Sequence, residues 1–281
     1  MLPAAPRIFA HRGFSSRHPE MTLAAYQEAV EWSIAEGVAV GLECDVQLTA
    51  DHQLVCLHDA VLGRTADAFG PVSQWTLPEL RALDFGSWKT SKPSPAQSSV
   101  VTLEQLLNLV LAARLRGADV ELVVETKHPQ PRGLELEQRV CELLSNYGWD
   151  RPGAPVRLIT FSRPAAELLA QRLPLTDRTL LLEGDLGPCA DGSLPPGIHV
   201  AGVDVRLLRG DPGFVARARE CGNEVHVWTV NDWSDISFCL EIGVTGLTTD
   251  CPDRVLEVLR RSPALTSGWG AAAARLTSSA A

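Results

Sequence analysis

The sequence lacks the features that mark several classes of protein. No run of apolar residues approaches the ~18 that a helix needs to cross a bilayer. The first residues, MLPAAPRIFAHRG, contain no basic segment followed by a long apolar core, as a secretory signal would. The seven cysteines are an odd number and form no C-x-x-C pair, which argues against a disulfide framework or a zinc site. We therefore expect a cytoplasmic protein with reduced cysteines and no transmembrane segment.

Lysine is scarce, since only three of the 25 basic side chains are lysines: Lys89, Lys92 and Lys127. The net charge of −9 argues against a broad nucleic-acid surface. An anionic small molecule remains compatible with this charge, because a few local cations and a metal ion can reverse the field in one cleft. Because lysine is scarce, Lys127 stands out, since it lies two residues after the acid Glu125.

Common nucleotide-binding and hydrolase motifs are missing as well. No G-x-G-x-x-G follows the first strand, and the chain has no G-x-x-x-x-G-K-[ST], G-x-S-x-G or H-E-x-x-H. Instead, strand-like and helix-like stretches alternate through most of the chain, which predicts a parallel sheet. About eight strands can be counted, which favours a closed (β/α)8 TIM barrel over an open doubly wound sheet. The predicted strands begin at Arg7, Val40, Val120, Val156, Arg178, Gly202, Glu224 and Gly246.

Two stretches depart from this rhythm. Residues 60–99 combine a glycine-proline turn, a short helical pattern and the polar tract KTSKPSPAQSS, and they are too few to form a core of their own. Residues 262–281 are rich in alanine and serine and lack the apolar spacing of a helix. We expect one barrel over residues 1–261, with a small insertion at about 60–99 after the second strand region, and a loose tail at 262–281.

The stretch GLECDVQLTADHQLVCLHD, from Gly41 to Asp59, has the pattern of a strand, a short turn and a second strand. Its first strand alternates with a period of two, so Glu43 and Asp45 point to the same side. Burying two unpaired carboxylates together is costly, and a hard divalent cation removes that conflict. The same alternation turns Cys44 to the opposite face, where we expect it to pack beneath a helix.

Other polar residues fall at the ends of predicted strands, and in a barrel these ends converge on the C-terminal rim, where that fold places its active sites. They are His11, Arg12, His58, Glu125, Lys127 and Trp228. Carboxylates suit a hard cation, Arg and Lys suit phosphate oxygens, and two histidines can serve as general acid and general base. Together they predict cleavage of a phosphoester. Ion pairing of Arg12 and Lys127 with nearby acids, and a purely packing role for Trp228, remain alternatives.

The sequence resembles the glycerophosphodiester phosphodiesterase family over about Ile8 to Leu259. The resemblance is carried by an ordered set of motifs: AHRG from Ala10, PEMT from Pro19, LECDVQLT from Leu42, LVCLHD from Leu54, LGRT from Leu62, GPVSQWTLPELRALDFGSW from Gly70, VVETKHP from Val123, VWTVND from Val227 and GLTTDCPD from Gly246. The whole set is specific to the family, whereas HRG alone would be weak.

The resemblance implies a (β/α)8 barrel with a small insertion after the second strand region, and it implies a role for each residue at the strand ends. Glu43, Asp45 and Glu125 match the metal ligands, for one divalent cation that is either Mg²⁺ or Ca²⁺. His11 and His58 match the acid/base pair, with a tilt towards His11 as base and His58 as acid. Arg12 and Lys127 match the phosphate-contacting cations, and Trp228 matches an aromatic residue at the glycerol end of the pocket.

The implied function is metal-dependent hydrolysis of a glycerophosphodiester, a small-molecule substrate, to sn-glycerol 3-phosphate and an alcohol. The nucleophile is either water or the substrate's own glycerol hydroxyl. Met21 departs from the family, which usually has asparagine there, and a thioether neither binds a hard cation nor donates a hydrogen bond.

Two alternatives stand beside this function. One is a lysophospholipase D or phosphoinositol-type phosphodiesterase on the same barrel, with an apolar groove formed by aromatic residues. The candidates for that groove are Phe14, Phe69, Trp75, Phe85 and Trp88. The other is a non-catalytic binding barrel, against which the complete set of histidines and carboxylates argues. The sequence leaves the alcohol head group and the oligomeric state open.

Overall fold

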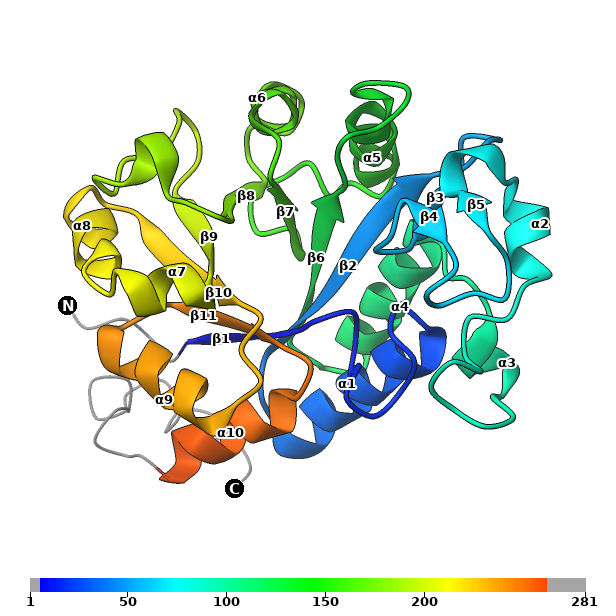
Figure 1. The fold of residues 1–281 in the computed structure, drawn as a ribbon, viewed down its shortest axis with the longest axis horizontal. Helices are drawn as coiled ribbons and strands as arrows, with labels where there is room; N and C mark the ends of the chain where they lie inside the picture. The colour runs from blue at the N-terminus through cyan, green and yellow to red at the C-terminus, as the bar shows by residue number, and fades with distance from the viewer. Residues whose placement is uncertain (1–5, 262–281) are drawn as a thin grey trace.

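Eight parallel strands close into a barrel in the computed structural model, which describes residues 6–261 (Figure 1). In the order in which they neighbour one another, the strands are β1 (Arg7–Ala10), β2 (Val40–Leu48), β6 (Val120–Thr126), β7 (Val156–Thr160), β8 (Asp177–Leu182), β9 (Val200–Asp204), β10 (Glu224–Trp228) and β11 (Gly246–Thr249). Pairing of β1 with both β11 and β2 closes the ring, so the predicted (β/α)8 barrel is confirmed. The predicted tail at 262–281 lies outside the described residues.

The helices lie outside the barrel, one or two after most strands (Figure 1). They are α1 (Leu23–Glu36), α4 (Leu103–Leu115), α5 (Glu135–Asn146), α6 (Arg163–Arg172), α7 (Val205–Gly210), α8 (Phe214–Glu220), α9 (Trp233–Ile242) and α10 (Pro252–Arg261). The first begins and ends as its sequence predicts. The side chain of Thr22 accepts a hydrogen bond from the Ala25 amide, and Gly37 ends the helix at a φ of +65°.

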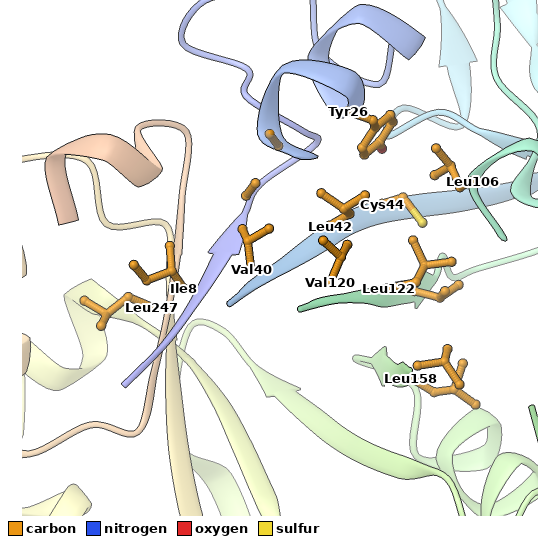
Figure 2. Packing of buried hydrophobic residues seen from close by; sticks show 14 of the residues in the cluster. Ile8, Tyr26, Val40, Leu42, Cys44, Leu106, Val120, Leu122, Leu158 and Leu247 are labelled. Atoms are coloured by element: carbon orange, nitrogen blue, oxygen red, sulfur yellow. The ribbon is translucent and has the colours of Figure 1, made fainter. Parts of the chain in front are cut away.

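The main core lies between the outer faces of the strands and these helices. All nine residues of β2 are buried, because one face of the strand meets helices and the other faces the barrel interior. Figure 2 shows Leu42 and Cys44 of β2 on the side where Tyr26 of α1 and Leu106 of α4 lie. Cys44 therefore packs beneath helices, as its place in the alternation predicts. The seven cysteines are all free of disulfides.

Several element boundaries differ from the sequence prediction, and β8 and β9 begin at Asp177 and Val200, one and two residues before the predicted Arg178 and Gly202. The first strand ends at Ala10 and not at Arg12, because Arg12 has a φ of +58° that turns the chain out of the strand. A helix, α7, follows β9 directly. The side chain of Asp204 explains it, since it accepts a hydrogen bond of 2.8 Å from the Arg206 amide and caps the helix.

The chain between β2 and α4 forms a layer beside the barrel, coloured cyan in Figure 1. It comprises β3 (Leu54–Cys56), which pairs antiparallel with β2, then β4 (Val61–Leu62), β5 (Gly70–Pro71), η1 (Val72–Gln74), α2 (Leu77–Arg81) and α3 (Pro95–Ser98). A small apolar cluster joins Val55 and Leu57 of the barrel side to Leu62, Leu80 and Phe85. This layer is therefore packed onto the strand that carries Glu43 and Asp45.

No helix among residues 6–261 is both long and apolar enough to cross a membrane.

Two leucines of α4 provide a matched test of where the core lies. Leu107 is fully buried, whereas Leu115 is 89% exposed. Leu107→Ala should lower the free energy of unfolding by about 2–5 kcal/mol, because it removes buried methyl groups and leaves a cavity. Leu115→Ala should change it by less than about 0.5 kcal/mol. Urea denaturation measures both values, and equal losses would contradict this packing of α4.

Candidate active site

The C-terminal ends of the strands surround a cavity of about 740 Å³ at the rim of the barrel. All eight residues predicted for the site line this cavity: His11, Arg12, Glu43, Asp45, His58, Glu125, Lys127 and Trp228. They come from β2, β6 and β10 and from the turns that follow β1, β3 and β6. For the residues of the barrel strands, this convergence follows from the parallel arrangement, in which the carboxyl ends face the same rim. His58 reaches the site differently, because β3 runs antiparallel to β2 and brings the Leu57 amide to 2.9 Å from the Asp45 carbonyl.

Three carboxylates form the floor of the cavity. Glu43, Asp45 and Glu125 are buried, and each offers one oxygen that lies within 4.8 Å of the other two. Register brings them together, because Asp45 of β2 pairs directly with Glu125 of β6, while Glu43 lies two residues earlier on the same face as Asp45. The Arg12 amide donates a hydrogen bond of 2.8 Å to Glu43 Oε2.

Two cations partly balance these carboxylates. Lys127 Nζ lies 2.8 Å from Glu125 Oε1 and 3.2 Å from Asp45 Oδ1. Arg12 Nε lies 3.4 Å from Asp45 Oδ2, an oxygen that is buried and has no hydrogen-bond partner among the described residues. The ion pairs that the sequence left as an alternative for Arg12 and Lys127 are therefore present, and they lie inside the cavity that could also receive a phosphate.

The electrostatics of the floor favour an additional positive charge. Burial and the neighbouring Asp45 raise the pKa of Glu125 to about 8, and burial raises the pKa of Glu43 well above its ordinary value. Burial opposes ionisation of Asp45 too, yet Lys127 and Arg12 hold its pKa at about 2. Three carboxylates that each bring one oxygen within 4.8 Å of the others suit a hard divalent cation. The residues present therefore fit such an ion.

Each histidine of the site is held by an aspartate. His11 Nδ1 lies 2.6 Å from Asp250 Oδ1, and Asp250 also accepts hydrogen bonds from Ser15 and Asn231. His58 Nδ1 lies 2.7 Å from Asp59 Oδ1. Such a bond fixes the Nδ1–H tautomer and places the lone pair on the other ring nitrogen, Nε2, which in His11 accepts a hydrogen bond of 3.2 Å from Arg12 Nε.

Sequence reasoning left these two aspartates out of the catalytic set. Asp59 is adjacent to His58, and Asp250 directly follows the last strand, at the rim where the other site residues gather. These two positions in the sequence indicate that each aspartate can lie close to a histidine of the site.

Trp228 lies at the rim of the cavity, whereas Met21 lies outside it. Trp228 donates a hydrogen bond of 3.0 Å from Nε1 to the Gly202 carbonyl and packs edge-on against Phe161, with ring centroids 5.5 Å apart. Met21 is buried, and its sulfur accepts a hydrogen bond of 2.9 Å from the Tyr26 hydroxyl. It does not line the main cavity.

None of the aromatic residues proposed for an apolar groove lines the cavity either. Phe14 and Phe85 are buried, and Phe69 is 82% exposed.

The floor of the site predicts a coupling between pH, metal and stability. In metal-free protein, the raised pKa of Glu125 means that the folded chain holds a proton that the unfolded chain releases above about pH 4.3. Stability should therefore fall as pH rises from about 4.3 to 8, and Glu125→Gln should weaken that fall. Mg²⁺ or Ca²⁺ should raise the thermal midpoint of the wild type at pH 8, and of the variant less.

Thermal unfolding in EDTA and in each metal measures this coupling. Identical pH profiles for wild type and Glu125→Gln would contradict the charge balance described for the floor.

Comparison with known proteins places this geometry in one family. The glycerophosphoryl diester phosphodiesterase family matches residues 11–254. A probable glycerophosphodiester phosphodiesterase 1 of Mycobacterium tuberculosis is 36% identical over 261 residues, which cover 90% of this chain and 92% of that protein. A glycerophosphodiester phosphodiesterase of Bacillus subtilis is 30% identical over 87% of this chain and 83% of its own.

A solved structure supports the same grouping. The phosphodiesterase of Oleispira antarctica, in complex with the product sn-glycerol-3-phosphate, has a TM-score of 0.78 and 25% identity, over 91% of this chain and 97% of that one. A family match over most of the chain, together with a relative above 30% identity over nine-tenths of it, confirms the resemblance seen in the motifs. The protein belongs to the glycerophosphoryl diester phosphodiesterase family.

Proposed function

We propose that this enzyme hydrolyses glycerophosphodiesters to sn-glycerol 3-phosphate and an alcohol, with a divalent cation and two histidines. One observation carries the proposal: three buried carboxylates and two aspartate-bound histidines line the same cavity. The cations Arg12 and Lys127 lie between these groups. Relatives named as glycerophosphodiester phosphodiesterases, and one relative that binds sn-glycerol-3-phosphate, support this choice of substrate.

Glu43, Asp45 and Glu125 would hold the cation, either Mg²⁺ or Ca²⁺. When bound, such an ion offsets the charge of the carboxylates and withdraws electrons from a phosphoryl oxygen. The carboxylates themselves orient the substrate from the floor of the cavity, and their buried position excludes bulk water from that side. The fit rests on the unpartnered Asp45 oxygen and on the raised pKa of Glu125.

The two histidines would divide the proton transfers. His11 Nε2 accepts a hydrogen bond of 3.2 Å from Arg12 Nε, so the lone pair of the ring lies on this nitrogen. When the Arg12 guanidinium turns to the phosphate, that lone pair would take a proton from the nucleophile. The oxygen of the nucleophile then forms a bond to phosphorus while the bond from phosphorus to the alcohol oxygen breaks, and the electron pair of the broken bond goes to the alcohol oxygen. His58 would give this oxygen a proton from Nε2, while Asp59 keeps the Nδ1–H in place.

Charge and shape would decide how the substrate lies. Arg12 and Lys127 supply positive charge for the phosphate oxygens, with a fork and a point charge respectively. Burial lowers the pKa of His58, and a bound phosphate anion opposes that effect by favouring the protonated ring. Trp228 and Phe161 offer an apolar wall of the cavity for the glycerol carbons.

An activity assay tests the proposal directly. Wild-type protein should release choline from glycerophosphocholine, and EDTA should abolish the release until Mg²⁺ or Ca²⁺ is restored. His11→Ala and His58→Ala should each lower kcat by at least about 10²-fold, the usual contribution of general acid–base catalysis. His199→Ala changes an exposed histidine and should have no effect.

Full activity in chelator would remove the metal from the proposal. A wild-type rate for His58→Ala would remove that histidine from catalysis.

Leaving-group dependence assigns the two histidine roles. The p-nitrophenyl ester of glycerol 3-phosphate releases a stable anion that needs no proton. His58→Ala should therefore be slow on glycerophosphocholine but close to wild type on the aryl ester, whereas His11→Ala should be slow on both. The opposite pattern would exchange the acid and base roles.

A further inference from the structure

Arg64 lies outside the barrel, just after β4, and binds two carboxylates at once. Its Nε lies 2.6 Å from Asp59 Oδ2. Its Nη1 and Nη2 lie 2.8 and 2.7 Å from the two oxygens of Glu20. A planar guanidinium can satisfy such a set because its donors diverge in a fixed fork, and a flexible ammonium cannot replace it.

Each of these carboxylates is linked by further contacts to a different histidine. Asp59 uses its other oxygen, Oδ1, to hold His58 Nδ1 at 2.7 Å. Glu20 Oε1 accepts a hydrogen bond of 2.7 Å from Arg12 Nη1, and Arg12 Nε reaches His11 Nε2 at 3.2 Å. A continuous chain of contacts thus runs from His58 to His11, with Arg64 in the middle.

The orientation of His58 depends on this chain. Among the described residues, Asp59 makes side-chain hydrogen bonds only to His58 and Arg64. Burial favours neutral Asp59 and Glu20, but their hydrogen bonds with Arg64 hold the pKa of each below its ordinary value. Both carboxylates therefore stay ionised, and Asp59 is held from two sides. Without Arg64, Asp59 is free to rotate towards solvent, and the His58 ring loses its fixed direction.

We propose that Arg64 is a positioning residue that holds Asp59, and through it His58, in the geometry that protonates the leaving alcohol. This inference rests on the proposed function. As the phosphorus–oxygen bond breaks, its electron pair goes to the alcohol oxygen, which takes the proton of His58 Nε2. The ring becomes neutral with its remaining proton on Nδ1, and Asp59 stays a carboxylate. Arg64 touches no reacting atom and acts only by fixing this alignment.

The proposal predicts a selective defect. A displaced His58 slows the departure of an alkoxide, which needs the proton, but not of p-nitrophenolate, which leaves as a stable anion. Arg64→Met should lower kcat on glycerophosphocholine by about 10- to 100-fold, less than the full loss of a general acid. The same variant should keep kcat on the p-nitrophenyl ester of glycerol 3-phosphate within about threefold of wild type.

A matched control separates positioning from general destabilisation. Arg116 also binds both oxygens of one glutamate, Glu31, at 2.5 and 2.8 Å, but on the outer surface of the helices. Arg116→Met should leave both rates unchanged. Thermal unfolding of all variants checks that they fold. If Arg64→Met does not fold, Arg64→Lys, which keeps a charge and an apolar stem, is used instead to compare kcat on the two esters.

A double-mutant cycle tests the route through Asp59. Asp59→Asn should show the same selective defect, and Asp59→Asn combined with Arg64→Met should be little slower than either single variant. Additive losses would overturn the proposal, as would equal losses on the two esters or a wild-type rate for Arg64→Met on glycerophosphocholine. A wild type inactive on both esters would instead overturn the proposed function, and the inference with it.

Discussion

Burial of three carboxylates at one end of the barrel is the constraint around which the site is arranged. Glu43, Asp45 and Glu125 each lose hydration on folding, and their mutual repulsion adds to that cost. Arg12 and Lys127 offset part of it, yet the pKa of Glu125 remains raised to about 8, and Asp45 Oδ2 has no hydrogen-bond partner among residues 6–261. Two cations against three acids leave the floor short of positive charge. That shortage suits the divalent cation proposed for the site, whose charge would in turn suit an anionic phosphate.

The same strand builds both the hydrophobic core and this charged floor. On β2, Leu42 and Cys44 face the helices, and Glu43 and Asp45 face the barrel interior. The pairing register of a strand buried on both faces is strongly fixed, because a slip of one residue would place carboxylates in the apolar layer and leucine in the cavity. Packing of Leu42 against the layer that contains Tyr26 therefore also fixes where the carboxylates point. At this strand, the register that stabilises the core is therefore the same register that sets the geometry of the site.

Much of this arrangement could be predicted from sequence, for identifiable reasons. Alternation with a period of two places Glu43 and Asp45 on one face and Cys44 on the other, and strand ends of a parallel barrel always share a rim. Contacts that depend on the conformations of long side chains could not be predicted in this way. Nothing local in the sequence indicates that Glu20 meets Arg64, 44 residues away, with two hydrogen bonds. The early end of β1 was also missed, since it depends on the left-handed backbone of Arg12, which residue preferences do not indicate.

The two histidines differ in what holds them, and this difference follows from the fold. His58 is oriented by Asp59, its neighbour in sequence, and by a layer packed beside the barrel. His11 is oriented by Asp250, 239 residues away, which reaches it only because β11 pairs with β1. The amide of His11 also donates to the Thr249 carbonyl at 2.9 Å, so barrel closure and the histidine–aspartate contact form together. The half of the site built on His11 therefore depends on the closed ring of strands. The half built on His58 depends on the side layer, whose sequence can change without reopening the barrel. Variation of that layer is thus a route by which the same barrel can alter the orientation of His58.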